Sequence, residues 1–209
     1  RGFYARRLRP VARDQGPDVV LNPQQMNILI PTVSPESVEA LVFDLGGVLL
    51  DVQLQRTLRA FEALDIRGLG AAEVIDGNRA CFRDLELGLI TQEEFAEAVR
   101  RTFPAVAAIP DEQLLEAWNA MLMPFDAQRV ELLRELGKRC PVYLLSNTNL
   151  PHRIRFRESF RERFGGSFDE LFVRCFYSDE LHLRKPDPEI YRSVARQIGT
   201  PPGKLLFID

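Results

Sequence analysis

Cysteine is scarce in this sequence, and long hydrophobic runs are missing. The 209 residues contain three cysteines, Cys81, Cys140 and Cys175, which are widely spaced and form no Cys-X-X-Cys pair. This pattern excludes a disulfide framework and a zinc knuckle, and it favours a reducing compartment. No hydrophobic run approaches the roughly 20 residues that cross a bilayer. We therefore expect a soluble, cytoplasmic protein.

An excess of charge of either sign is also missing. The 27 basic and 30 acidic side chains leave a formal net charge of −3, which provides no overall attraction to a polyanion. Neither nucleic acid nor an anionic membrane is therefore an expected partner. Hydrophobic residues make up 45% of the chain, enough for the core of one domain with an insertion. The oligomeric state leaves no signature in the sequence.

The beginning of the chain lacks sustained hydrophobic periodicity. Five prolines between Pro10 and Pro35 predict an irregular N-terminal extension over residues 1–37. The first 13 residues carry five arginines and no acid, as transit peptides do, but they contain no serine. An extension upstream of a natural start at Met26 is therefore the favoured interpretation.

The remaining residues show two kinds of hydrophobic pattern. Residues 40–44 form a short apolar run of the type buried in a parallel sheet, followed by Gly46 and Gly47. Residues 54–125 show helical periodicity without a strand pattern. The rest of the chain predicts strands over residues 141–145, 172–177 and 204–209, which alternate with helices over 126–137, over 150–164 and from Asp187 onward.

This alternation predicts an α/β fold in which a doubly wound parallel sheet carries an inserted α-helical cap. The expected domains are the extension over residues 1–37, a core over 38–53 and 126–209, and a helical cap over 54–125. Thr91 and Glu94 predict a capping box at the start of one cap helix. Asp111 is expected to cap another, in which Trp118 packs in the core rather than serving as a ligand platform.

Polar residues follow each predicted strand. Ligands bind beyond the carboxyl ends of the strands in sheets of this class, so these residues are expected to meet at one edge. The residues concerned are Asp44 with Gly46 and Gly47, then Ser146, Asn147, Thr148 and Asn149, then Arg184 and Lys185, and finally Asp209. A carboxylate, a hydroxyl, exposed amides, an ammonium group and a second carboxylate suit a divalent cation and a phosphoryl group.

Each of these groups has a predicted task. Asp44 is the candidate nucleophile, which would form an aspartyl-phosphate. Asp44, a carbonyl near Gly46 and Asp209 are the candidate oxygen ligands of Mg²⁺, and Lys185 adds a fixed positive charge. Ser146 is expected to hold the phosphoryl oxygens. Candidate substrate contacts in the neighbouring backbone come from Gly47, Asn147 and Thr148.

Four segments in order resemble the four motifs of the haloacid dehalogenase superfamily. They are residues 42–51 (VFDLGGVLLD), 144–149 (LLSNTN), 183–191 (LRKPDPEIY) and 205–209 (LLFID). Within this superfamily the chain is most similar to bacterial sugar-phosphate phosphatases with a helical cap, including the glucose-1-phosphatase type. The resemblance implies a Rossmann-like fold, magnesium dependence and hydrolysis of a small phosphorylated metabolite by Asp44, Ser146, Lys185 and Asp209.

The chain departs from the family pattern at two places. Most phosphatases of the superfamily have a second aspartate, the general acid and base, where this chain has Gly46. Loss of such a group costs about 10²- to 10⁴-fold in rate, although the subgroup that this chain resembles often has glycine there. Asp51 is expected to lie past the turn rather than to replace it. The family usually continues with another acid after Asp209, so a C-terminally incomplete core and metal site are expected.

Other functions remain open at this point. A 2-haloacid dehalogenase also uses an aspartate nucleophile and lacks the second aspartate, but it has no use for Asp209. A non-catalytic module that binds a phosphorylated ligand or a protein is a further alternative. His152 and His182 are expected to be structural or on the surface. Arg79 and Arg83 are expected on a solvated helix face rather than in contact with a substrate anion.

Overall fold

The computed structural model describes residues 37–74 and 79–209, so the expectations for the N-terminal extension and Met26 lie outside the described residues. Short 3-10 turns lie at Pro104–Val106 (η3), Phe168–Leu171 (η4) and Pro202–Lys204 (η5). The strands are β1 (Ala40–Phe43), β2 (Leu50–Val52), β3 (Leu122–Phe125), β4 (Val142–Ser146), β5 (Arg174–Tyr177) and β6 (Leu205–Ile208). The helices are α1 (Leu54–Ala63), α2 (Ala71–Val74), α3 (Ala80–Glu86), α4 (Gln92–Thr102), α5 (Asp111–Asn119), α6 (Ala127–Gly137), α7 (Leu150–Phe164), α8 (Ser178–Leu181) and α9 (Pro188–Ile198).

Four of these strands form a parallel sheet in the order β5-β4-β1-β6. Successive side chains of a strand point to opposite faces, so a strand that is covered on both sides needs a continuous apolar run. In β1, Leu41 and Phe43 pack on one face of the sheet, whereas Val42 packs on the other. The expected α/β fold with a parallel sheet is confirmed.

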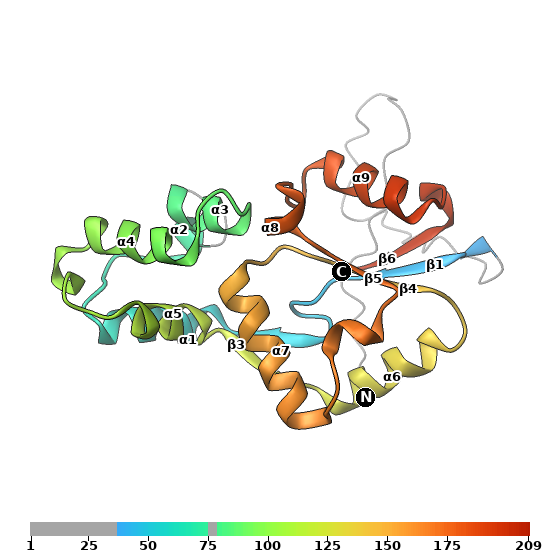
Figure 1. Ribbon diagram of the computed structural model, residues 1–209, viewed down its shortest axis with the longest axis horizontal. Helices are drawn as coiled ribbons and strands as arrows, with labels where there is room; N and C mark the ends of the chain where they lie inside the picture. Colours follow the sequence, from blue (N-terminus) through green and yellow to red (C-terminus); the bar gives the residue numbers. More distant parts are fainter. Residues whose placement is uncertain (1–36, 75–78) are drawn as a thin grey trace, which may run out of the picture.

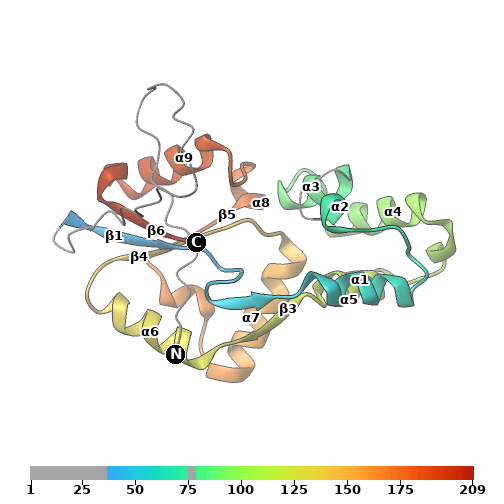
Figure 2. The same cartoon turned by 180° about the vertical axis from the view of Figure 1, so that it is seen from behind.

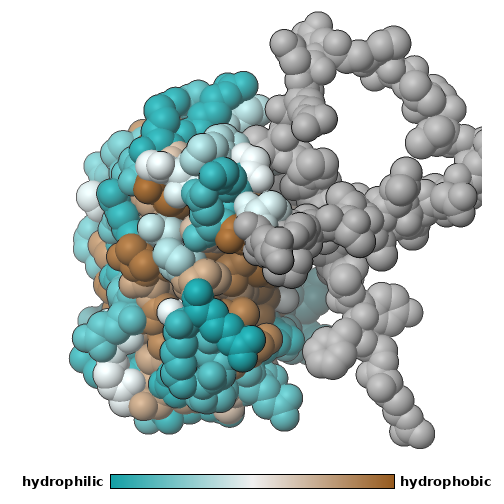
Figure 3. All heavy atoms as spheres, turned by 90° about the vertical axis from the view of Figure 1, so that its right-hand side faces the viewer, coloured by the Kyte–Doolittle hydropathy of each residue, from teal (hydrophilic) through white to brown (hydrophobic). Residues whose placement is uncertain are grey.

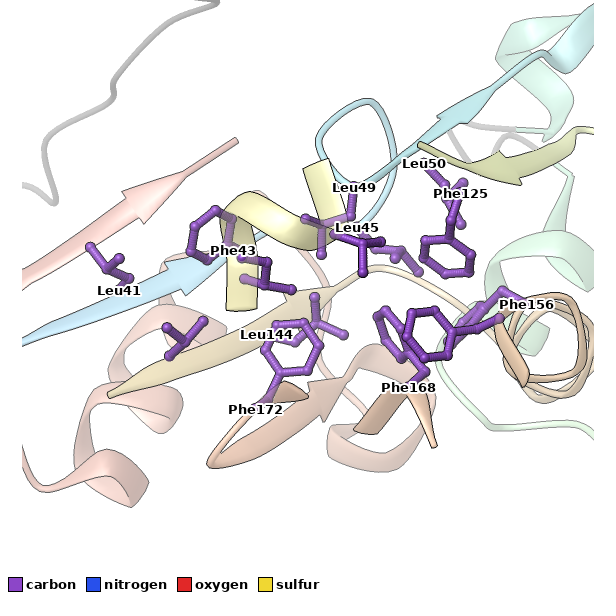
Figure 4. Close-up of a cluster of buried hydrophobic side chains, with 14 of the residues drawn as sticks. Leu41, Phe43, Leu45, Leu49, Leu50, Phe125, Leu144, Phe156, Phe168 and Phe172 are labelled. Atoms are coloured by element: carbon purple, nitrogen blue, oxygen red, sulfur yellow. The ribbon is translucent and has the colours of Figure 1, made fainter. Parts of the chain in front are cut away.

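Helices cover both faces of this sheet (Figure 1). On one face, α6, α7 and η4 contribute phenylalanine and aliphatic side chains to a core that Figure 4 shows in close-up, with Phe125, Phe156 and Phe168 beside Leu144 of β4. On the other face, Ile190 and Val194 of α9 pack against the sheet. The view from behind in Figure 2 shows the same arrangement, with α9 and α6 on opposite sides.

A separate set of helices, α1 to α5, extends from one end of the sheet (Figures 1 and 2). We call residues 54–121 the helical segment. It has its own core, in which Phe82, Phe95 and Trp118 pack as a group of aromatic rings. The capping box predicted at Thr91 is confirmed, since its hydroxyl accepts from the backbone of Glu94 and the Glu94 carboxylate accepts from the backbone of Thr91.

The connection between the helical segment and the core differs from the sequence expectation. A strand, β3, lies within residues 54–125, where only helices are expected. It pairs antiparallel with β2, with Leu50 opposite Phe125 and Val52 opposite Leu122. The two partners are about seventy residues apart, and β3 has only 4 residues, including Pro124. Pairing across such a separation leaves no local pattern, because it depends on the helices folding back.

Smaller differences concern helix and strand ends. Asp111 is the first residue of α5 and not its cap, since Pro110 occupies the cap position and no side-chain cap bond forms. The strand expected over residues 172–177 begins only at Arg174, and the last strand begins at Leu205. Ends of elements depend on pairing partners, which a single sequence does not reveal.

Figure 3 views the side where β1 begins, and there hydrophilic residues border a hydrophobic area.

Candidate active site

The strand ends that the sequence singles out meet at the carboxyl edge of the sheet. Phe43 of β1 is paired with Ile208 of β6, which places Asp44 and Asp209 directly after the ends of two neighbouring strands. The Nζ atom of Lys185 lies 2.8 Å from Oδ1 of Asp44 and 3.9 Å from Oδ1 of Asp209. Both Lys185 and Asp44 are largely buried at this edge. Three residues from distant parts of the chain thus form one charged cluster.

Burial dominates the electrostatics of Asp44. Removal from water raises the pKa of its carboxyl group from 3.8 to about 6, a shift that the neighbouring Lys185 ammonium opposes and the Asp209 carboxylate enlarges. The group is therefore ionised above about pH 6, as a nucleophile must be. One of its oxygens, Oδ1, accepts from the backbone N–H of Leu45 at 2.7 Å, which fixes the orientation of the carboxylate.

The side chain of Asn147 holds the main chain of Lys185. Its Nδ2 donates to the Lys185 carbonyl at 2.9 Å, and its Oδ1 accepts from the Lys185 N–H at 2.8 Å. Two bonds between an amide side chain and one residue fix both position and rotation. The structure thus gives the Asn147 side chain a contact with Lys185, in addition to the substrate contact predicted for this position.

The residues after β4 are arranged in different ways. Ser146 is buried at the end of the strand, and its Oγ lies 3.3 Å from the carbonyl of Asn147. The N–H of Thr148, a predicted phosphoryl-oxygen donor, instead donates to Oγ of Ser178 at 2.9 Å. Ser178 also lies 2.8 Å from the carbonyl of Glu86 in the helical segment. Thr148 and Ser178 therefore join the core to that segment.

The loop after β1 is a tight turn. Gly47 has a φ of +78°, which favours glycine, and its N–H donates to the carbonyl of Leu50 at 2.7 Å. Gly46 lies beside Val52, since a Cβ at position 46 would be 3.1 Å from the Val52 side chain. Asp51 lies past the turn, as expected, where it forms an exposed ion pair with Arg129 at 2.8 Å. It does not replace the acid missing at position 46.

A cleft separates this edge of the sheet from the helical segment. The cleft is open to solvent, and its space, including that open part, amounts to about 610 Å³. Gly46, Ser146 and Asn147 line its core side, and Phe82 and Trp118 line its other side. Trp118 belongs to the core of the helical segment, as expected, but it also borders this cleft. The helical segment therefore covers the place where a ligand of the strand ends would extend.

His152 is a buried part of the cleft wall. Its ring stacks on Trp118, with centroids 4.7 Å apart and planes 18° from parallel. Burial lowers the pKa of His152 to about 3, so the ring is neutral at physiological pH. Its Nδ1 lies 2.7 Å from Oδ1 of Asn119, an acceptor, which places the proton on Nδ1. The expectation of a structural role agrees with these contacts.

Sequence reasoning missed Glu86, the last residue of α3. Its Oε1 lies 2.7 Å from Nε of Arg184, the neighbour of Lys185, and both side chains are mostly buried. Burial raises the pKa of Glu86, and the charges of Arg184 and Lys185 oppose that shift. The two partners are far apart in the sequence, and nothing in the helical pattern around Glu86 signals the contact.

The other basic and histidine side chains considered from the sequence do not line the cleft. The Arg79 guanidinium lies over the ring of Phe103, 5.1 Å from its centroid. Arg83 is half exposed and forms an ion pair with Asp84 at 3.2 Å. His182 is near the surface, with Nδ1 at 2.7 Å from the carbonyl of Leu87.

The donor set at the carboxyl edge fits magnesium. Two carboxylates, Asp44 and Asp209, lie on adjacent strand ends, and the mutual repulsion that helps to raise the Asp44 pKa is the kind that a bound cation relieves. Magnesium prefers oxygen ligands and keeps several waters, so it needs few protein side chains. Within residues 37–74 and 79–209, no cluster of three or more His, Cys, Asp or Glu side chains offers an alternative metal site.

Comparison with known families agrees with this geometry. The haloacid dehalogenase-like hydrolase family matches residues 38–209, which include the whole sheet and the helical segment. The chain belongs to this family and is a hydrolase. The resemblance of the four strand-end motifs to this superfamily is thereby confirmed, whereas the narrower likeness to the glucose-1-phosphatase type stays a prediction.

Individual proteins and solved structures are also similar to this chain. The chain is 26% identical to the D-ribitol-5-phosphate phosphatase of Bacteroides thetaiotaomicron over 174 residues, 82% of each chain. It is 36% identical to a sesquiterpene phosphatase of Aspergillus oryzae over 85 residues, 40% of each chain. Among solved structures it is similar to a HAD family enzyme of Bacteroides thetaiotaomicron in complex with magnesium, with a TM-score of 0.72, 29% identity, and coverage of 82% of this chain and 83% of that one.

No helix in the described part of the chain is long and apolar enough to cross a bilayer.

Proposed function

We propose that this protein is a magnesium-dependent phosphatase that hydrolyses a small phosphorylated metabolite through an aspartyl-phosphate on Asp44. The observation that carries the proposal is the cluster in which Lys185 Nζ lies 2.8 Å from Asp44 with Asp209 beside it. Relatives whose names state phosphatase activities, on D-ribitol-5-phosphate and on a sesquiterpene phosphate, support the reaction class.

In the proposed reaction, an ionised oxygen of Asp44 attacks phosphorus, and the bond between phosphorus and the alcohol oxygen breaks. The leaving alcohol oxygen takes a proton from a water molecule, since glycine at position 46 has no acidic group to donate one, and a hydroxide ion is left. This hydroxide attacks the phosphorus of the aspartyl-phosphate, the bond between phosphorus and the Asp44 oxygen breaks, and inorganic phosphate and the free Asp44 carboxylate are formed. Lys185 and Ser146 stabilise the charge on the phosphoryl oxygens.

Magnesium would be held by Asp44, the Gly46 carbonyl and Asp209. When bound, it offsets the repulsion between the nucleophile and the phosphate. The structure of a similar enzyme in complex with magnesium supports this choice of metal. The two hydrogen bonds from the Asn147 side chain hold the Lys185 backbone in place beside the site.

The test is hydrolysis of p-nitrophenyl phosphate with added Mg²⁺ and with EDTA. We expect turnover with Mg²⁺ that EDTA abolishes. Release of chloride from a 2-haloacid, insensitive to EDTA, together with no phosphate release, would instead establish a dehalogenase. If the protein hydrolyses no phosphate ester, and the parent and Asp44→Asn bind phosphate equally well, it is a binding module and not an enzyme.

A further inference from the structure

The lining of the cleft becomes less polar with distance from the carboxyl edge of the sheet. Near the edge, Ser146 and Asn147 present polar groups to the cleft. Away from it, the lining consists largely of hydrocarbon and aromatic side chains from β2, α2, α3 and the residues at the start of β3 and just before it. Val52 and Leu122 are the more exposed of these, and the nearly buried Leu50, Val74, Phe82 and Met121 lie behind and between them. A phosphate held at the strand ends would thus extend its alcohol portion into apolar surroundings.

The two heteroaromatic rings of the wall already use polar atoms within the protein. Trp118 donates from Nε1 to Oδ1 of Asn149 at 3.3 Å, and Nδ1 of His152 is paired with Asn119. Oδ1 of Asn149 also accepts from the His152 backbone at 3.1 Å. Because the rings stack on each other, they form one planar aromatic feature of the wall rather than two separate polar groups.

Charge on the far wall is compensated. Among the described residues that line the cleft, Glu86 alone carries a charge, and it is paired with Arg184 at 2.7 Å. The His152 ring is neutral at physiological pH because burial holds its pKa near 3. A charged group on the alcohol portion of a substrate would therefore lose its hydration without gaining an uncompensated partner.

We propose that the preferred substrates are phosphomonoesters of a neutral alcohol with an apolar ring or chain, rather than of a polyol. This inference rests on the proposed phosphatase function and specifies its substrate class. Apolar contact with the wall favours such an alcohol. Each hydroxyl of a polyol that enters the apolar part of the cleft loses hydrogen bonds to water without regaining them, which weakens binding.

A matched pair of substrates tests the inference. Cyclohexyl phosphate and myo-inositol 1-phosphate share a six-membered carbon ring with one phosphoryl group. In the second, each of the remaining ring carbons carries a hydroxyl. We expect kcat/KM with added Mg²⁺ to be at least about tenfold higher for cyclohexyl phosphate. Equal or higher kcat/KM for the inositol ester would overturn the inference.

A cleft variant links the preference to the wall. Val52 lines the cleft and is 41% exposed, so Val52→Asn is compatible with folding. We expect this change to lower the cyclohexyl-to-inositol ratio of kcat/KM about threefold or more, whereas Leu132→Asn, on the exposed outer side of α6, leaves the ratio unchanged. An unchanged ratio in Val52→Asn, or an equal fall in both variants, contradicts a role for the wall.

Hydrolysis of p-nitrophenyl phosphate in the same preparation separates the two proposals. If it is hydrolysed and the inositol ester is preferred over the cyclohexyl ester, the phosphatase function stands and the substrate class is wrong. If none of the three esters is hydrolysed with added Mg²⁺, the proposed function itself is wrong, and the substrate class falls with it.

Discussion

At the carboxyl edge of the sheet, the Lys185 ammonium lies within 4 Å of a carboxylate oxygen of Asp44 and of Asp209, whereas the helical segment faces the neighbouring cleft mainly with hydrocarbon and aromatic side chains. The residues at this edge are charged, and the sheet that holds them is packed against hydrophobic side chains on both faces. The helical segment uses residue types that also build its own core. The two regions therefore differ in kind: charged side chains from distant segments define the edge, and apolar packing defines the helical segment.

The two regions also differ in how they are joined. Ser178 contacts the Glu86 carbonyl, Arg184 pairs with the Glu86 carboxylate, and His182 contacts the Leu87 carbonyl. All three contacts reach the end of α3 from the segment around α8. The helical segment is thus fastened to the core beside Lys185, so that a change in this junction affects both stability and the site.

The largest expected effect comes from the candidate nucleophile. Asp44→Asn removes the ionised oxygen that attacks phosphorus, and we expect turnover of p-nitrophenyl phosphate to fall at least about 10⁴-fold. Asp51→Asn is the matched control, because Asp51 is exposed and paired with Arg129 away from the cleft. Its activity should stay within about twofold of the parent. Retention of a tenth or more of the activity in Asp44→Asn would exclude covalent catalysis by this residue.

Removal of the Lys185 charge should have the next largest effect. Lys185→Met keeps the length of the side chain but removes the ammonium group beside Asp44, and we expect kcat to fall about 10²- to 10³-fold. Lys138→Met, at an exposed position paired with Glu135, is the control. Steady-state kinetics at saturating Mg²⁺ measures both. Equal activities of the two variants would show that Lys185 does not act on the reacting group.

The junction with the helical segment is tested at Gly88. Its φ is +64°, and a Cβ there would lie 2.0 Å from the carbonyl oxygen of Asp179. We expect Gly88→Ala to destabilise the protein by about 2–4 kcal/mol, from backbone strain and overpacking. At Gly137, a Cβ would meet nothing within 4 Å, so Gly137→Ala should be neutral or stabilising by up to about 1 kcal/mol. Urea unfolding measures the difference, and equal midpoints would contradict the close contact.

The smallest effect concerns pH and magnesium. Burial raises the pKa of Asp44 to about 6, and protonation below that pH removes the nucleophile, so kcat/KM should fall as the pH is lowered. Magnesium binds the ionised carboxylates in competition with protons. Lowering Mg²⁺ within the saturating range should therefore move the acid limb of the pH profile upward, toward the pKa of metal-free Asp44, by at most about one pH unit for each tenfold decrease. An acid limb that does not move would separate the titrating group from the metal.

Local patterns in the sequence predict much of the core. The apolar runs at β1 and β4 and the cap-plus-proline start of α9 at Asp187 are sufficient, since a buried parallel strand and a capped helix depend mainly on neighbouring residues. The meeting of Asp44, Lys185 and Asp209 also follows, because parallel strands bring their carboxyl ends to one edge. The β2–β3 pair and the Glu86–Arg184 contact could not be predicted, because their partners are distant in the chain.

The sequence by itself therefore determined the fold class and the order in which Asp44, Lys185 and Asp209 follow the strands and helices of the core, because both depend on short-range patterns. Only the tertiary structure decided how Asn147 holds Lys185, where Glu86 lies, and that Trp118 and His152 stack at the cleft. The Glu86 and Trp118 contacts arise when the helical segment folds onto the core, and the Asn147 contact arises when two distant segments of the core meet. The energies of such contacts depend on the distance between the side chains and on their burial, and neither can be read from the order of residues along the chain.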